Sequence, residues 1–384
     1  MAASSGRASL GAQPPGVVPA LALFAAIRLT GVTVLALLAA LTGRPPLKSL
    51  AHSWDSVWYL HIAKHGYGTR IHISATGALQ RDWAFFPLYP VLIRVLSRVL
   101  HVGPGAAALL IAWCAAALAA YGIYAIGHRL HGRAVATVLV ALWAALPHSV
   151  VLSLAYTEPL FSALAAWSLY AVLKGRWMAA GALAALAGLT RPSGIAAAVA
   201  VVTAAGCEAV RRRGRVPPGL WAGALLAPLG WAGYVLWVGQ QSGDLLHGYF
   251  QAQSAWNSRL DLGAGTLRFL KALLLHGGGA VQPLALVIVA ASLVLFLLLC
   301  LDRGPLPLVV FAGVLLAMVI TVSGPFSSKP RFLLPAFPLL LPMACGLVRA
   351  WRTGPKQAAL VGGSVAAMSL VYGAYLVLIA RQPL

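Results

Sequence analysis

The chain has 384 residues, of which 28 are Lys or Arg and only 7 are Asp or Glu, and 60% of it is hydrophobic. A soluble domain has about 25% charged and about 45–50% apolar residues. With 9% charged residues, this chain lacks the polar surface of a soluble globule and the polarity of a disordered chain. Its apolar blocks of roughly 15–24 residues are near the length that crosses a bilayer. The composition therefore excludes a soluble globular protein and a disordered chain, and it predicts an all-α polytopic membrane protein.

The apolar blocks predict the course of the chain. Residues 1–19 are rich in Ser, Gly and Pro and are expected to form a disordered cytoplasmic amino terminus. Residues 20–384 are expected to form one transmembrane domain. We expect about eleven spans, near residues 20–41, 105–127, 134–152, 158–173, 177–190, 194–209, 218–239, 279–301, 305–323, 332–348 and 358–379.

The net charge of +21 is interpreted as a topology signal and not as a nucleic-acid surface. The basic residues occupy short breaks between apolar blocks, where the positive-inside rule places them on the cytoplasmic side. Alternate breaks carry about 13 basic residues against 3 in the others. The amino terminus is therefore expected to be cytoplasmic, and the long loops 43–104 and 240–278 external. Arg outnumbers Lys 22 to 6, which is typical of genes with GC-rich codons. We therefore expect a bacterial source and a protein of the plasma membrane.

The first external loop contains Trp54, Asp55, Trp58 and Tyr59 at helical spacing. This spacing predicts a short helix in the membrane interface, where Trp and Tyr accumulate. Asp55 would be a lone carboxylate near the membrane surface. It would serve either as a general base on a sugar hydroxyl or as the amino-terminal cap of the helix.

The same loop ends in an aromatic, proline-containing segment that includes Asp82 and Tyr89. Its two prolines predict a bent segment that re-enters the edge of the bilayer. Asp82 would be a second functional carboxylate, a helix cap, or the ion-pair partner of Arg81.

Three further charged residues stand at the external ends of predicted spans. Glu158 precedes Pro159, Arg191 precedes Pro192, and Arg331 follows Lys329-Pro330. Charges at membrane depth cost roughly 2.5–3.5 kcal/mol on insertion scales, which makes them candidates for function. Glu158 would alternatively interact with a helix amino terminus. The two arginines would either bind a lipid phosphate or anchor the spans at the interface.

We expect no metal, cofactor or nucleic-acid ligand. His61 and His65 are four residues apart, but no third ligand is specified and no Glu falls between them in an HExxH register. The four cysteines never occur as CxxC. No glycine-rich phosphate-binding loop is present.

Five short motifs occur in order along the chain. They are Trp54-Asp55-x-x-Trp58-Tyr59-x-x-Ile62-Ala63-x-x-Gly66-Tyr67, Phe85-Phe86-Pro87-Leu88-Tyr89-Pro90, Thr157-Glu158-Pro159-Leu160-Phe161, Arg191-Pro192-Ser193-Gly194 and Pro330-Arg331-Phe332. The ordered set resembles the PIG-V family, of the GPI mannosyltransferase II type, and its bacterial relatives. The likeness extends from the first span to about residue 340.

This resemblance implies a GT-C glycosyltransferase with a long helical first external loop. Such an enzyme takes mannose from a polyprenyl-phosphate-mannose donor on the external face and inverts the anomeric centre, from a β-linked donor to an α-linked product. Asp55 would be the catalytic general base. Substrate-binding residues would be Asp82, Glu158, Arg191, Arg331, Trp54, Trp58, Tyr59 and Tyr89. The acceptor would be a lipid-linked or glycan hydroxyl, since bacteria have no GPI.

Two alternatives remain open. One is a GT-C transferase of another sugar, such as arabinofuranose, or a protein O-mannosyltransferase. The other is a transporter or flippase of a lipid-linked sugar, which should carry ionisable residues near the midplane and inverted repeats. The chain shows no convincing repeat, and five of its seven acids fall on the predicted external side. The acceptor and any partner subunit are not specified by the sequence.

Overall fold

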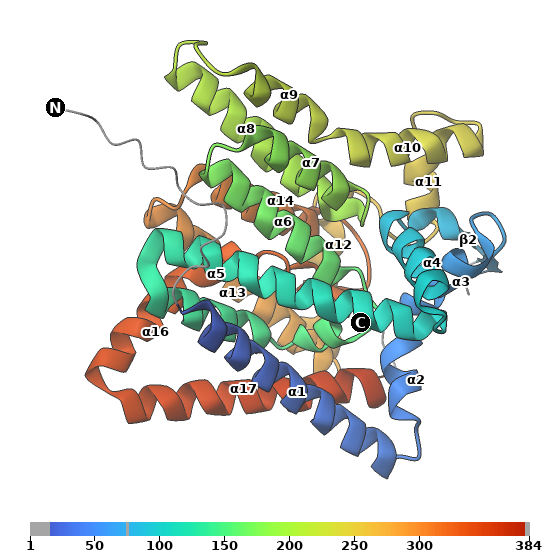
Figure 1. Cartoon of the computed structure of the whole chain (residues 1–384). Helices are drawn as coiled ribbons and strands as arrows, with labels where there is room; N and C mark the ends of the chain where they lie inside the picture. Colours follow the sequence, from blue (N-terminus) through green and yellow to red (C-terminus); the bar gives the residue numbers. More distant parts are fainter. Residues whose placement is uncertain (1–15, 74–76, 381–384) are drawn as a thin grey trace.

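A computed structural model describes residues 16–73 and 77–380, and this part of the chain is almost entirely helical (Figure 1). The main helices are α1 (Val17–Leu41), α5 (Pro104–Ala144), α6 (Glu158–Leu173), α7 (Trp177–Gly188), α8 (Ile195–Arg211), α9 (Pro218–Leu226), α10 (Leu229–Ser242), α13 (Val281–Leu301), α14 (Leu306–Thr321), α16 (Leu341–Thr353) and α17 (Pro355–Leu378). They form the body of the molecule.

Further helices and one pair of strands connect the main helices. The α-helical ones are α2 (Pro46–Ala51), α3 (Ser56–His65), α4 (Leu88–Leu100), α11 (Gly248–Ser254), α12 (Ala264–His276) and α15 (Lys329–Phe332). The 3-10 helices are η1 (Asp82–Ala84), η2 (Ser149–Ser153), η3 (Pro192–Gly194), η4 (Phe326–Ser328) and η5 (Phe337–Leu340). Strands β1 (Ile71–Ile73) and β2 (Leu79–Arg81) form an antiparallel hairpin in which Ile71 pairs with Arg81. The sequence did not predict this hairpin.

The prediction of a polytopic helical membrane protein is confirmed. Within the described residues, six helices are long and apolar enough to cross a membrane, and a seventh span forms if η4–α15 and η5–α16, bent by 81°, count as one. Helices α6, α7 and α14 are apolar but shorter. Each of the eleven predicted segments contains helix, while the count of eleven spans stays a prediction. The first helix begins at Val17, inside the predicted loose segment, and residues 1–15 lie outside the described residues.

Helix α5 is a helical hairpin that bends at Gly132. This glycine has φ 83°, a left-handed conformation that glycine adopts without steric cost. A Cβ atom on Gly127 would lie 3.0 Å from the Cα of Ala136. Nine residues of straight helix would separate these positions by about 13 Å, so the chain folds back on itself here. The first arm corresponds to the predicted segment 105–127. The second arm covers the start of the predicted segment 134–152 but ends at Ala144, and η2 follows.

Small residues let α7 approach α9 and α10 closely. A Cβ atom on Gly181 would lie 2.1 Å from the carbonyl oxygen of Gly223, and one on Gly230 would lie 1.8 Å from that of Ala185. Apolar helices in lipid gain no hydrophobic free energy from contact with one another, so close backbone packing between small residues stabilises their association.

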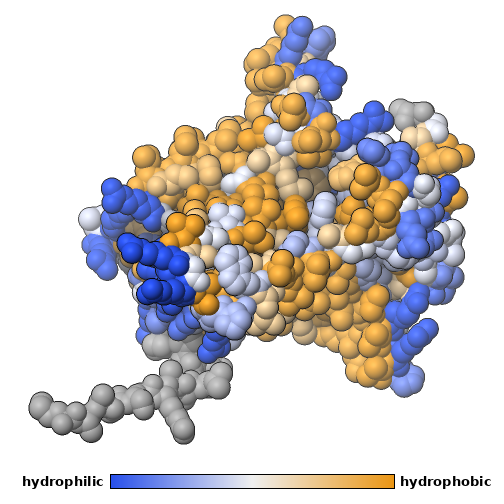
Figure 2. All heavy atoms as spheres, turned by 90° about the horizontal axis from the view of Figure 1, so that it is seen from above, coloured by the Kyte–Doolittle hydropathy of each residue, from blue (hydrophilic) through white to orange (hydrophobic). Residues whose placement is uncertain are grey.

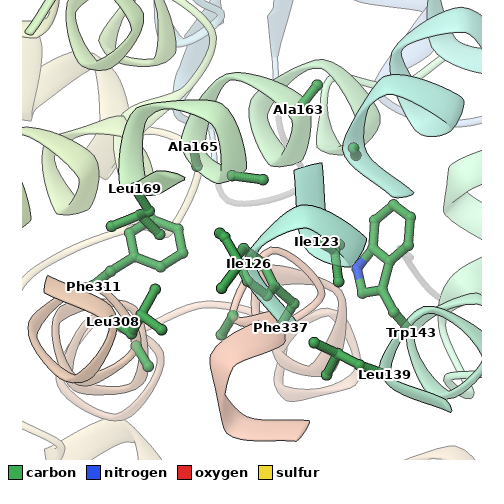
Figure 3. Close-up of a cluster of buried hydrophobic side chains, with 14 of the residues drawn as sticks. Ile123, Ile126, Leu139, Trp143, Ala163, Ala165, Leu169, Leu308, Phe311 and Phe337 are labelled. Carbon is green, nitrogen blue, oxygen red and sulfur yellow. The ribbon is translucent and has the colours of Figure 1, made fainter. Parts of the chain in front are cut away.

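The main core lies between α5, α6, α14 and η5. Figure 3 shows Ile126 and Phe337 between Phe311 on one side and Trp143 on the other. All four side chains are fully buried. The indole nitrogen of Trp143 donates to the carbonyl oxygen of Leu334 (2.9 Å), which satisfies its one polar group.

A buried arginine fastens α1 to the body of the protein. Arg28 is 8% exposed, and its guanidinium donates to Ser149 Oγ (2.7 Å), to Ser153 Oγ (2.8 Å) and to the carbonyl oxygen of Ala144 (3.0 Å). Because a buried cation without partners is costly, this set of acceptors holds α1 against η2. The sequence analysis did not single out Arg28.

Charge separates the two ends of the molecule. In Figure 1 the bend of α5, the turn between α8 and α9, and the end of α16 lie toward the left, and these segments carry most of the basic clusters. Helices α2, α3, α4 and α11 and strand β2 lie toward the right. Figure 2 shows hydrophilic residues gathered toward both sides of the view, with apolar residues covering most of the surface between them. This is the surface of a protein that crosses a bilayer.

Candidate active site

Four of the predicted residues form a chain of charges. Arg331 Nη2 donates to Asp55 Oδ2 (2.6 Å), and Arg331 Nε lies 3.6 Å from Glu158 Oε1. Arg191 Nη1 lies 2.9 Å from the same oxygen. The order in space is therefore Asp55, Arg331, Glu158, Arg191, two acids alternating with two bases. We call these four residues the charge cluster.

Local sequence places each member of the charge cluster. Pro192 restricts the residue before it to extended backbone, and Arg191, which directly precedes η3, accordingly has φ −168°. Glu158 is the first residue of α6, with Pro159 in its first turn. Pro335 cannot donate to a helical ladder, and the 81° break between α15 and α16 spans it. That break places Arg331 within the protein, with 7% of its surface exposed.

Asp55 occupies the amino-terminal cap position of α3, but its side chain makes no capping hydrogen bond. Its carboxylate instead binds Arg331, 276 positions away in the sequence. The Asp55 side chain is 30% exposed, whereas those of Glu158, Arg191 and Arg331 are at most 8% exposed. Asp55 is therefore the accessible end of an otherwise buried cluster.

The buried members have unused hydrogen-bonding capacity. Oε2 of Glu158, Nε of Arg191 and Nη1 of Arg331 are buried and make no hydrogen bond to the described residues. Buried polar atoms in native proteins are nearly always paired, and exceptions often mark functional sites. The site thus offers two cationic donors and one anionic acceptor. Arg191 and Arg331 are both buried. They therefore do not anchor the spans at the interface by extending their charged ends into water.

Aromatic rings enclose the two guanidinium groups. The ring of Phe332 lies 4.8 Å from Arg331 Cζ and 5.3 Å from Arg191 Cζ. Tyr156 lies 5.3 Å from Arg331 Cζ on another side. Desolvated cation–π contacts stabilise such cations, and the rings also keep water from the charges.

A buried aromatic group lies beneath Asp55. Tyr59 makes edge-to-face contacts with Phe85 (5.2 Å) and Tyr89 (5.4 Å), and its hydroxyl is 3.4 Å from Thr157 Oγ1. Burial and the nearby Asp55 carboxylate raise the pKa of Tyr59, so it remains a neutral phenol at physiological pH. Tyr89 Oη donates to the carbonyl oxygen of Ala108 (2.9 Å). Both tyrosines fix the position of α3 against α4, α5 and α6.

Trp58 is buried by a residue that the sequence analysis missed. Its ring stacks on Phe85 (5.5 Å) and meets the edge of Trp256 at 4.9 Å. Trp256 comes from the second long loop, and its indole nitrogen donates to the carbonyl oxygen of Arg81 (3.1 Å). The two predicted external loops therefore contact each other. No local motif around Trp256 distinguishes it from the other tryptophans of the chain.

Asp82 and Trp54 are not members of the charge cluster, although Trp54 directly precedes Asp55 in the chain. Asp82 is fully buried, and both of its carboxylate oxygens accept from the backbone N–H of Gly68 (3.0 and 2.9 Å). Trp54 is 40% exposed and has φ 48°. The contact with Gly68 gives Asp82 a role in holding the loop before β1. The binding of substrate by these two residues stays a prediction.

Comparison with known proteins matches part of the chain to one family. Residues 36–209 match the profile of the family described as Mannosyltransferase (PIG-V). The predicted resemblance to that family is confirmed over this segment. The segment holds Asp55, Glu158 and Arg191, but not Arg331. No curated protein matches the sequence of the chain.

The fold is similar to that of ArnT from Cupriavidus metallidurans. The structure of ArnT bound to undecaprenyl phosphate superposes with a TM-score of 0.51 at 15% identity, covering 93% of this chain and 75% of that one. Apo ArnT gives 0.50 at 14% identity, with 94% and 75% covered. The predicted all-α GT-C architecture is confirmed as a fold, and the first long loop, residues 43–104, carries helices α2, α3 and α4. Together, the family match and the fold support a glycosyltransferase.

Proposed function

We propose that the protein transfers mannose from a polyprenyl-phosphate-mannose donor to a hydroxyl of a lipid-linked or glycan acceptor, with inversion. The observation that carries this proposal is the charge cluster, in which one accessible carboxylate completes a balanced set of two acids and two bases whose other three members are buried. A transferase that uses a lipid phosphate as leaving group needs a base, cations for the departing phosphate and a site with little water.

In the proposed reaction, the Asp55 carboxylate accepts the proton of the acceptor hydroxyl. The hydroxyl oxygen forms a bond to the anomeric carbon as the bond from that carbon to the phosphate oxygen breaks. The electron pair leaves with the polyprenyl phosphate. One displacement of this kind turns a β-linked donor into an α-linked product, and the proton then passes from Asp55 to water.

We assign the donor phosphate to the unused guanidinium donors of Arg331 and Arg191. Arginine binds phosphate through paired N–H groups, and Nη1 of Arg331 and Nε of Arg191 are available for this. Glu158 Oε1 holds both arginines in position, and Oε2 is available to accept a sugar hydroxyl. The undecaprenyl phosphate bound to ArnT supports a polyprenyl-phosphate donor. The lipid is a co-substrate, and the proposal needs no other cofactor.

The proposal places the charge cluster at the external face of a bacterial plasma membrane, with the amino terminus in the cytoplasm. The basic turns at the opposite end of the molecule support this orientation through the positive-inside rule. A donor lipid would then enter from the outer leaflet. The acceptor would approach Asp55, the exposed member of the cluster.

A donor panel tests the proposed reaction. Purified protein in lipid nanodiscs is incubated with a lipid mannoside acceptor and either polyprenyl-phosphate mannose or polyprenyl-phosphate arabinofuranose. We expect an α-mannosidase-sensitive product from the mannose donor only. Transfer of arabinofuranose alone would contradict the assignment of the sugar. Movement of the intact donor across liposomes, with no transfer from either donor, would identify a transporter instead.

A further inference from the structure

A cavity of about 470 Å³ opens at the end of the molecule opposite the charge cluster. It lies between the bend of α5, the turn from α13 to α14, and the face of α16. Helix α14 begins beside it and runs 16 residues, about 24 Å, to Thr321, whose carbonyl oxygen accepts from the N–H of Asp261 in the predicted external loop. The cavity is therefore separated from the proposed active site by most of the thickness of a bilayer.

Two arginines, Arg303 and Arg349, line this cavity. The side chains of Arg303 and Arg349 make no ion pair or hydrogen bond within residues 16–73 and 77–380. His131 is a third potential cation on the wall, and Asp302 is the one acid. The excess of positive charge favours an anionic ligand.

The backbone holds Arg303 in an unfavourable conformation. Arg303 has φ 51° directly after the end of α13, with its N–H donating to the carbonyl oxygen of Cys300 and that of Gly304 to Leu299. This is the position after a helix that glycine usually takes. Here the chain has its glycine one residue later and places an arginine in the left-handed position instead. Strain at a residue that lines a cavity is a recurrent feature of binding sites.

The remaining wall is apolar and continues onto the lipid-facing surface. Leu299 and Leu341 line the cavity and are themselves buried. Leu298 and Leu301, on the same helix end, are 41% and 76% exposed. A ligand with acyl chains would therefore find apolar surface leading from the cavity into the hydrocarbon. Cavities of about 300–1,000 Å³ are typical of small-ligand sites.

We propose that this cavity binds the headgroup of an anionic phospholipid of the phosphatidylglycerol type, from the leaflet opposite the charge cluster. Arg303 and Arg349 pair with the phosphodiester, Asp302 accepts from the hydroxyls of the glycerol headgroup, and the acyl chains follow the exposed leucines of α13. Basic pockets between membrane helices on the cytoplasmic side are known to bind anionic headgroups. The inference does not depend on the proposed transfer reaction.

Native mass spectrometry of the full chain, titrated with phosphatidylglycerol or phosphatidylcholine, tests this inference. We expect phosphatidylglycerol to bind at least fivefold more tightly than phosphatidylcholine. Removing both charges in R303Q/R349Q should abolish that preference. The matched control is R352Q, because Arg352 lies one turn further along α16 and does not line the cavity. Equal losses in R352Q and the double variant would overturn the site, since they would indicate unspecific attraction to a basic surface.

A second variant separates binding from folding. Arg303→Gly removes the charge and also relieves the positive φ, so the protein should unfold at the same or a higher temperature while binding phosphatidylglycerol more weakly. Unchanged binding in a folded Arg303→Gly variant would contradict the proposal. Competition between polyprenyl phosphate and phosphatidylglycerol identifies the lipid. If polyprenyl phosphate binds more tightly and loses affinity in R303Q/R349Q, the cavity is a site for the donor lipid. The assignment to phosphatidylglycerol would then be wrong.

Discussion

At the scale of single residues, Glu158 is the centre of the charge cluster. Glu158 Oε1 lies within 3.6 Å of a nitrogen of each arginine. Glu158 is the ion-pair partner of Arg191, which does not contact Asp55 in the cluster. A buried ion pair contributes little net stability compared with an apolar core. The loss of one partner is costly, because it leaves an uncompensated buried charge.

Glu158→Gln is therefore expected to be strongly destabilising. The substitution keeps the shape of the side chain but leaves Arg191 and Arg331 without their shared carboxylate, at a cost of about 3–5 kcal/mol. Thermal unfolding in detergent measures the effect. The matched control is Glu208→Gln, whose partners Arg211 and Arg212 are exposed, and it should change the unfolding temperature very little. Equal unfolding temperatures for the two variants would contradict a structural role for Glu158.

The sequence predicted the members of the cluster better than their arrangement. Charges at the ends of apolar segments singled out Asp55, Glu158, Arg191 and Arg331 one at a time. Their pairing depends on contacts between residues up to 276 positions apart, which no local pattern records. The contact of Asp82 with Gly68 was likewise hidden, because it depends on how the loop folds back.

At the scale of elements, the packing of α7 against α10 depends on the absence of a side chain. A Cβ atom at Gly230 would lie 1.8 Å from a carbonyl oxygen of α7, whereas one at Gly233, on the same helix, would meet nothing within 4 Å. Hydropathy located both apolar segments correctly, but it does not distinguish these two glycines. The same limit applies to the buried Arg28, whose acceptors lie in a different part of the chain.

The contrast between the two glycines gives a prediction. Gly230→Leu should separate α7 from α10 and lower both the unfolding temperature and the yield of folded protein, because backbone atoms cannot move aside cheaply. Gly233→Leu should be tolerated, since leucine is a good helix former and points into open space. Size-exclusion chromatography and thermal unfolding measure both variants. A fully stable Gly230→Leu protein would contradict the close approach of the two helices.

At the scale of the whole molecule, the proposed function depends on orientation. Composition alone predicted a polytopic helical protein, and the structure then placed the basic turns at one end and α3, which Asp55 directly precedes, at the other. The exact number of spans was harder to predict. The 81° break after α15 and the two-part α9–α10 segment have the hydropathy of ordinary spans.

Cysteine labelling in sealed cells tests the orientation. Cys114, Cys207, Cys300 and Cys345 are first replaced by alanine, and single cysteines are then introduced at Arg212 or Asp244. A membrane-impermeant maleimide should label the Asp244→Cys variant from outside, and the Arg212→Cys variant only after lysis. The opposite pattern would place the charge cluster in the cytoplasm and contradict the external reaction.

The central claim is that the Asp55 carboxylate takes the proton of the acceptor, and Asp55→Asn tests it most directly. The amide keeps the size of the side chain and can still accept a hydrogen bond from Arg331, but it cannot act as a base. Single-turnover transfer from polyprenyl-phosphate mannose is measured for this variant and for Asp244→Asn, which removes an exposed acid outside the cluster. With rates normalised to the folded fraction of each variant, we predict a loss of at least 10²-fold for Asp55→Asn, the lower end of the range for a general base, and a near-normal rate for Asp244→Asn. Transfer by folded Asp55→Asn at the parent rate would contradict the account.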